Sequence, residues 1–186
     1  MTTLFGTSEL AIGTMEGVSR VRLFDGPLDL SWRHCATTSD FFADLFALRF
    51  QASRNDYREV HHSIGYLVNE LIENAVKFRA QGEIVIEASM DSEHFKLKVL
   101  NDVDGDDVSE FQSLLADITV GDPRDLLIQR IEANAANPDV TGSGLGLLTL
   151  MSDYGARLAW IFSSVDETDR ICLETYASIP ISQTHN

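Results

Sequence analysis

The chain has 186 residues, 44% of them apolar, and a formal net charge of −15, which predicts one globular domain with a substantial core. So acidic a surface repels the phosphate backbone of nucleic acids, and we expect no nucleic-acid partner. Because no run of 18 apolar residues and no secretory signal is found, and the two cysteines lie far apart, we expect a cytoplasmic protein without a membrane span.

Residues 1–37 predict an N-terminal extension with a β-hairpin. Residues 18–24 alternate as a strand does, an Asp-Gly-Pro turn follows at residues 25–27, and residues 28–32 read as the second strand. Ser39 and Asp40 then predict the start of a helix that runs to about Arg54. Its apolar stripe is expected in the core, and a docking face for a partner is the alternative.

Residues 57–79 predict a long helix with a polar stripe beside its apolar face. Glu70, Asn74 and Lys77 fall at i, i+4 and i+7, so their side chains share a direction. A carboxylate in this position can take a proton or orient a nucleophile. An amide oxygen suits Mg²⁺, and a lysine can reach a phosphate as a point charge. Taken alone, the stripe also fits an ordinary solvated helix surface.

The rest of the chain predicts a hairpin, a helical segment, a glycine turn and a second hairpin. Strands are expected at residues 82–90, 94–100, 156–163 and 170–177, and helices at 108–118, 123–136 and 145–154. The glycine turn is Gly-Ser-Gly-Leu-Gly-Leu at residues 142–147. Its amides can approach an anion closely at the start of a helix. A flexible hinge or a plain helix entry is the alternative for the glycines alone.

Two of these segments resemble motifs of the GHKL nucleotide-binding family, which includes sensor histidine kinases, anti-sigma-factor serine kinases and gyrase. Residues 70–78, Glu-Leu-Ile-Glu-Asn-Ala-Val-Lys-Phe, resemble its N box, and residues 142–147 resemble its second glycine box. The resemblance covers about residues 38–180. It implies an α/β sandwich of the Bergerat type, with a mixed, largely antiparallel sheet and helices on one face. Residues 38–186 would be the ATP-binding domain, with an ATP lid at about 106–141.

The same resemblance implies the roles of the site residues. Glu70 would be the general base, as in the ATPases and serine kinases of the family, and Asn74 the Mg²⁺ ligand. The nucleotide would be held by the following residues: Asn74, Lys77, Asn101, Gly105, Gly142, Ser143, Gly144, Leu145 and Gly146. Arg124 and Arg130 in the lid are candidates for the terminal phosphate, although lid arginines are often ordinary surface residues.

The family's Asp-x-Gly-x-Gly motif is altered in this chain. In the best register Asn101 replaces the aspartate that reads adenine, Val103 replaces the first glycine, and Gly105 keeps the second. A neutral acceptor holds a donor less tightly than a carboxylate, which predicts a loss of adenine affinity on the order of tenfold. Val103 disfavours the positive φ that glycine allows, so the loop is expected to bend differently.

These observations predict a regulatory serine/threonine kinase of the anti-sigma-factor type, using ATP and Mg²⁺ on a STAS-domain antagonist. His61 and His62 lie on the same helix as Glu70 and cannot enter its pocket, so autophosphorylation on histidine is disfavoured. A catalytically weak GHKL module that docks a STAS-like or sigma-like partner is the alternative, and an ATP hydrolase is the third. A homodimer is left open.

Overall fold

Six strands form one sheet in the computed structural model, which describes residues 2–24, 32–136, 144–164 and 170–181. The strands are β1 (Thr2–Gly6), β2 (Ser19–Phe24), β3 (Glu83–Met90), β4 (His94–Val103), β5 (Arg157–Ser164) and β6 (Ile171–Pro180). Their order is β1-β5-β6-β4-β3-β2, and all five pairings are antiparallel. The predicted mixed sheet is therefore wrong among the described strands, because β3–β4 and β5–β6 pair as consecutive neighbours that reverse the chain.

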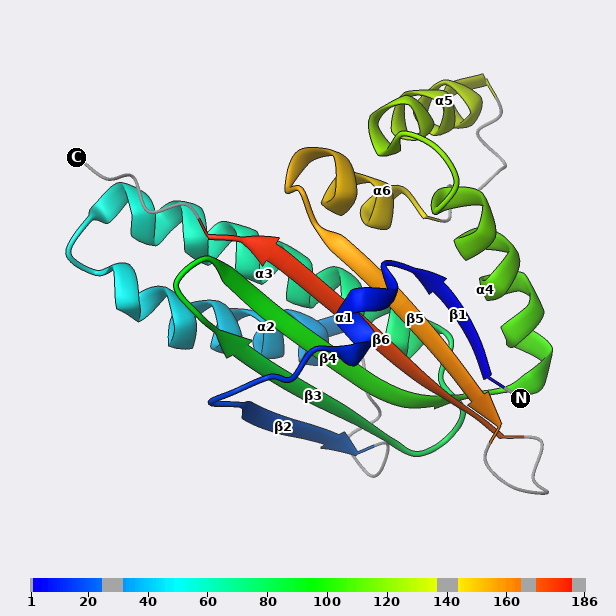
Figure 1. Cartoon of the computed structure of the whole chain (residues 1–186), viewed down its shortest axis with the longest axis horizontal. Helices are drawn as coiled ribbons and strands as arrows, with labels where there is room; N and C mark the ends of the chain where they lie inside the picture. Colours follow the sequence, from blue (N-terminus) through cyan, green and yellow to red (C-terminus); the bar gives the residue numbers. More distant parts are fainter. Residues whose placement is uncertain (1, 25–31, 137–143, 165–169, 182–186) are drawn as a thin grey trace.

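The helices divide unequally between the two faces of the sheet (Figure 1). They are α1 (Ser8–Ile12), α2 (Trp32–Ala47), α3 (Arg54–Lys77), α4 (Gly105–Ile118), α5 (Pro123–Ala136) and α6 (Leu145–Asp153), with a 3₁₀ turn, η1 (Leu48–Phe50), after α2. Helices α2 and α3 cover one face, the short α1 crosses the other, and α4 to α6 gather beside β1 and β5. The predicted α/β sandwich is confirmed at this coarse level.

Helix α3 is the long helix that the apolar periodicity predicts. The Ser53 side chain accepts a hydrogen bond from the Asp56 N–H at its N-terminus, which satisfies one of the free donors of the first turn. The helix buries an apolar stripe against the sheet: Val60, Ile64, Leu67, Val68, Leu71, Ile72 and Ala75. On β4 the alternation turns Phe95, Leu97 and Val99 towards the helices. Glu70 and Asn74 thus lie on a helix held firmly by the core.

The N-terminal region differs most from the predictions. Strands β1 and β2 are the two edges of the sheet, paired with β5 and β3, so residues 2–6 and 19–24 are part of the main sheet. Trp32, expected to end a strand, begins α2, and residues 28–31 lie outside the described part. The expected domain boundary at residue 37 falls inside that helix.

The predicted start of a helix at Ser39 and Asp40 is wrong. Ser39 lies inside α2, is buried, and its hydroxyl donates 2.8 Å to the Ala36 carbonyl. A serine can satisfy its hydroxyl on the preceding turn instead of capping a helix, so the local cap signal was misleading. The helical segment also breaks after Ala47, and α3 begins separately at Arg54.

The face of the sheet opposite α2 and α3 carries a polar cluster on its central strands. Lys98 Nζ lies 2.6 Å from Glu174 Oε2, and the Tyr176 hydroxyl donates to the same oxygen over 2.6 Å. Burial alone would raise the pKa of Glu174, but the hydrogen bonds from Lys98 and Tyr176 outweigh it and hold the pKa below its ordinary value of 4.5. The ionised carboxylate therefore stabilises the fold.

We expect Glu174→Gln to lower the free energy of unfolding at pH 7 by about 1–3 kcal/mol, the contribution typical of hydrogen bonds to a charged group. A carboxyl with a depressed folded-state pKa stabilises above its unfolded pKa and loses this effect as the pH falls through the folded value. Urea unfolding should therefore show the two proteins converging below about pH 4. The exposed Glu93→Gln is the control and should stay within about 0.5 kcal/mol at every pH; a pH-independent loss in Glu174→Gln would contradict the prediction.

Candidate functional site

The carboxylate of Glu70 lies directly against Gly146 in the first turn of α6. A Cβ atom placed on Gly146 would overlap Oε2 and the carboxyl carbon of Glu70. Only glycine leaves this space free, so the polar stripe of α3 and the glycine turn meet as the sequence predicts. The expected juxtaposition of Glu70 with this turn is present in the structure.

The glycine turn enters α6 through Gly144, which has a φ of 90°. A residue with a side chain rarely adopts this left-handed conformation. A Cβ atom at Gly144 would also come within 2.8 Å of Leu114 Cδ1 on α4. Leu145 is the first helical residue, while the predicted phosphate contacts Gly142 and Ser143 lie outside the described residues.

Asn74 lies one turn after Glu70 on α3, and the backbone carbonyl of Glu70 orients its side chain. Its Nδ2 donates to the backbone carbonyl of Glu70 over 2.8 Å. Because a carbonyl only accepts, the amide nitrogen must face the helix backbone, and Oδ1 faces away from that bond. The oxygen, and not the nitrogen, is thus the atom that this side chain could offer to a hard cation, which prefers oxygen ligands and retains several waters.

Lys77 is exposed at the C-terminal end of α3, and its ammonium group lies 4.8 Å from the centre of the Phe78 ring. The Phe78 ring in turn stacks on Phe111 of α4, with centroids 4.5 Å apart. This cation–π contact places the charge beside the helix end. The role of Lys77 as a phosphate contact stays a prediction.

The end of β4 carries a buried polar atom without a partner. Asn101 is only 4% exposed, and its Nδ2 donates to the Asp102 carbonyl over 3.2 Å. Its Oδ1 has no hydrogen-bond partner among the described residues. An unsatisfied buried acceptor costs about 1–3 kcal/mol, so a donor that reached this oxygen would stabilise the protein.

Val103 and Gly105 do not form a glycine-type bend. Val103 is 1% exposed, continues β4 opposite Ile171 and bridges to Arg79. Gly105 is the exposed first residue of α4. The valine thus keeps the chain extended where the family motif has its first glycine, as expected from the conformational cost of a positive φ.

Burial raises the pKa of the Glu70 carboxyl above its ordinary value of 4.5, and the charge of Glu73 raises it further. A hydrogen bond from the Tyr66 hydroxyl opposes this shift. A partly desolvated carboxylate with a raised pKa is a better proton acceptor than one in water.

The predicted lid divides into two different parts. Helix α4 buries Val108, Phe111, Leu115 and Ile118 in the core, whereas α5 buries no residue. Arg130 of α5 lines a hollow of about 420 Å³ with Asp117 of α4 and Leu148 of α6, and Arg124 is exposed. Of the two helices described within the predicted lid, α5 therefore has the looser packing.

Two residues of the site were not singled out from the sequence. Burial raises the pKa of the Tyr66 phenol, the charge of Glu70 raises it further, and the hydroxyl of Thr149 on α6 opposes the shift. Tyr66 precedes Glu70 by four residues, so the i, i+4 rule that linked Glu70 to Asn74 places it on the same stripe. Thr149 follows Leu145 by the same interval and gave no separate signal.

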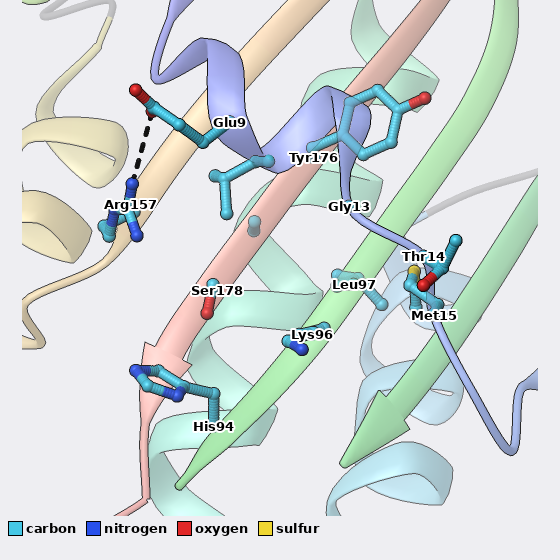
Figure 2. A pocket seen from close by; sticks show the side chains of 12 residues that line it. Glu9, Gly13, Thr14, Met15, His94, Lys96, Leu97, Arg157, Tyr176 and Ser178 are labelled. Carbon is cyan, nitrogen blue, oxygen red and sulfur yellow. Dashed lines mark hydrogen bonds and ion pairs between the residues drawn. The ribbon is translucent and has the colours of Figure 1, made fainter. Parts of the chain in front are cut away.

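A second hollow, of about 270 Å³, lies on the opposite face of the sheet beneath α1 (Figure 2). His94, Lys96 and Ser178 line it, and Glu9 and Arg157 close one side with an ion pair of 3.4 Å. Lys96 is itself paired with Asp91 at 2.9 Å. The basic groups are thus largely compensated, and none of the predicted site residues faces this hollow.

No described helix is both long enough and apolar enough to cross a membrane. Within the described ranges, three or more His, Cys, Asp or Glu side chains nowhere converge on a metal position, and Cys35 and Cys172 are free thiols. A magnesium ion held by one amide oxygen, phosphates and water does not require such a cluster. No family model, curated protein or solved structure matches the chain.

A double-mutant cycle tests the contact between Glu70 and Gly146. In the wild-type background, Gly146→Ala should be neutral or destabilising because the new methyl group must displace the carboxylate. In the Glu70→Ala background the same change should stabilise by up to about 1 kcal/mol, since alanine favours the helix over glycine. We expect a coupling of at least about 0.5 kcal/mol in urea unfolding.

Gly65→Ala on α3 is the matched control, because its Cβ would make only an ordinary 3.6 Å contact with Ala43. Its effect should be the same in both backgrounds. Equal effects of Gly146→Ala in the two backgrounds would show that the carboxylate is elsewhere.

Proposed function

We propose that this protein is a cytoplasmic regulatory serine/threonine kinase of the anti-sigma-factor type, which binds ATP with Mg²⁺ and phosphorylates a STAS-like antagonist. The observation that carries the proposal is the contact between the Glu70 carboxylate and Gly146. It joins a candidate base to a helix start that suits an anion, as transfer of a phosphoryl group requires. Glycine is needed there because a side chain would occupy the space of the carboxylate.

Asn101 supports a nucleotide as the ligand. Its Oδ1 is buried and has no partner within residues 2–24, 32–136, 144–164 and 170–181. The resemblance places the residue that recognises adenine at this position. The exocyclic amino group of adenine is a donor that would satisfy it. A base bound there would form a neutral hydrogen bond of about 0.5–1.5 kcal/mol in place of a charged one.

Asn74 supports the magnesium requirement, because its amide nitrogen is used by the Glu70 carbonyl and its oxygen is left for a ligand. Bound magnesium would neutralise charge that develops on the phosphates. Glu70 would accept the proton of a serine or threonine hydroxyl. The hydroxyl oxygen then bonds to the γ-phosphorus while the bond to the bridging oxygen breaks, and ADP leaves with that electron pair.

A binding module without catalysis is the second candidate, and Val103 is the observation that favours it. The valine is buried in a continuous β4 and leaves no glycine bend at the expected edge of the adenine site. A protein of this kind would dock a STAS-like or sigma-like partner and bind nucleotide weakly or not at all. Thermal stabilisation by magnesium and ATP separates the two candidates, because a ligand stabilises the fold by mass action.

Replacing Asn101 by leucine should have opposite effects on stability and on binding. Removal of an unsatisfied buried acceptor should raise the free energy of unfolding of the ligand-free protein by about 1 kcal/mol. Loss of the adenine hydrogen bond should weaken ATP binding by about three- to tenfold. Both effects are measured by urea unfolding and by calorimetric titration.

Purine riboside triphosphate, which is ATP without the 6-amino group, is the control ligand for this substitution. The wild type should bind it more weakly than ATP, whereas Asn101→Leu should bind the two alike. If the wild type binds ATP and purine riboside triphosphate equally well, Asn101 does not form a hydrogen bond with the adenine amino group.

Glu70→Gln should leave the Kd for magnesium-ATP within about threefold and reduce phosphoryl transfer at least about a hundredfold, the contribution typical of a general base. Transfer is followed with γ-phosphate-labelled ATP and a STAS-domain acceptor. Glu73→Gln is the matched control: Glu73 lies on the same helix, but its carboxylate accepts from Asn69 Nδ2 at 2.7 Å. Retained transfer in Glu70→Gln would remove Glu70 from the proposed role.

A further inference from the structure

The hollow beneath α1 is lined by hydrogen-bond donors from three neighbouring strands. In the strand register, Arg157 of β5 and Lys96 of β4 both lie opposite Ser178 of the central β6. Residues directly opposite each other in an antiparallel sheet project from the same face. The guanidinium, the hydroxyl and the ammonium therefore project into one hollow, with the hydroxyl between the two cations (Figure 2).

Apolar side chains of the N-terminal segment close the hollow on the side away from the sheet. Leu10 of α1 and Met15, which follows that helix, line it and are partly buried. Helix α1 itself buries no residue. The hollow of about 270 Å³ is slightly smaller than a usual ligand site of about 300–1,000 Å³, so it suits a ligand with a short chain.

The two cations keep donors for a ligand although each forms an ion pair. Lys96 Nζ lies 2.9 Å from Asp91 Oδ2, and Arg157 Nη2 lies 3.4 Å from Glu9 Oε2. In the part of the chain that the structure describes, neither cation forms another ion pair. An ammonium and a guanidinium group each have further N–H donors, so both can bind one more oxygen.

The two carboxylates of these ion pairs are held very differently. Asp91 Oδ1 accepts from the N–H groups of Glu93 and His94 at 2.8 and 2.7 Å, which makes its carboxylate part of the β3–β4 turn. The side chain of Glu9, in contrast, is 73% exposed. An exposed ion pair contributes little to stability. Another carboxylate can therefore replace Glu9 at Arg157 at little cost.

We propose that this hollow binds a small monocarboxylate with a short apolar chain, which takes the place of Glu9 on Arg157. The ligand carboxylate would lie over Ser178 and accept from Arg157 and Lys96, and its chain would lie against Leu10 and Met15. Asp91 already balances Lys96, so a single negative charge balances the site once Glu9 has left Arg157. A second negative charge on the ligand would have no partner there.

This site does not depend on the proposed kinase activity. It lies on the face of the sheet opposite α2 and α3, and Glu70, Asn74 and Asn101 do not line it. The net charge of −15 repels anions from the protein as a whole. A hollow with two cations on its floor is therefore a place where a carboxylate would be selected by its fit and not by long-range attraction.

Hexanoate is the probe, and methionine methyl groups labelled with carbon-13 report its binding to the full chain by NMR. The Met15 signal, assigned with Met15→Leu, should shift saturably with millimolar hexanoate, because Met15 lines the hollow. The Met151 signal should stay in place, since Met151 of α6 does not line it. Hexanamide has the same shape without the charge and should give no saturable shift. An unmoved Met15 signal, or the same shift with hexanamide, would overturn the proposal.

Substitution of the cation should weaken binding of hexanoate. Arg157→Gln should raise the Kd at least about tenfold, because a hydrogen bond between charged groups is lost. Arg22→Gln is the matched control: Arg22 of β2 is equally exposed and is ion-paired with Glu83 at 3.7 Å, but it does not line the hollow. Its Kd should stay within about twofold, because salt screens distant charges. Equal changes in the two variants would contradict the proposal.

Substitution of Glu9 should have the opposite effect. Glu9→Gln keeps the size of the side chain and removes the competing charge, so the Kd for hexanoate should fall about two- to fivefold, the contribution of an exposed ion pair. Glu16→Gln, in the same segment but outside the lining of the hollow, should leave the Kd unchanged. If Glu9→Gln does not bind hexanoate more tightly than the wild type, the ligand does not replace Glu9 and the proposal is wrong. These titrations contain no nucleotide, so their outcome is separate from that of the kinase assays.

Discussion

The close approach of the Glu70 carboxylate to Gly146 is the contact on which the site depends. It requires a glycine in the first turn of α6 and a long α3 that is held in place by the core. The preceding glycine, Gly144, lets the chain enter α6 at a positive φ next to Leu114 of α4. Because Gly146 and Gly144 have no side chain, α6 can pack closely against both α3 and α4. A carboxylate, an amide oxygen and the start of a helix are brought together as a result.

In the proposed kinase this arrangement would have an electrostatic cost, which a bound cation would offset. A carboxylate beside a helix N-terminus is favourable in the ligand-free protein, because the helix dipole attracts negative charge. A triphosphate at the same helix end would be repelled by Glu70 and by the net charge of −15. Asn74, one turn along α3, offers an uncharged oxygen that adds no further repulsion. The proposed magnesium ion is therefore needed to let base and phosphates occupy neighbouring positions.

The sequence predicted the parts of the fold in which local and tertiary preferences agree. Apolar periodicity located α3, and alternation located β3 and β4, because these elements bury one regular face. The sequence-based prediction was wrong at the start of α2, because Ser39 donates to a carbonyl of its own helix. It was also wrong at the N-terminus, because β1 and β2 pair with strands far along the chain. Distant pairings leave no local periodic signal.

Two residues at the end of β4 favour opposite conclusions about nucleotide binding. Val103 extends the strand and pairs with Ile171, which stabilises the sheet and removes the glycine bend. Asn101, two residues earlier on the same face, has a buried Oδ1 with no partner in the described part of the chain, at a cost of about 1–3 kcal/mol. A surface used only to dock a protein partner does not need this buried oxygen. Leucine or valine at position 101 would make the fold more stable. Under the proposed function, Val103 would make the adenine site less open, while Asn101 would keep an acceptor for a base with an amino group. Weakened nucleotide binding is therefore the form of the proposal that accommodates both residues.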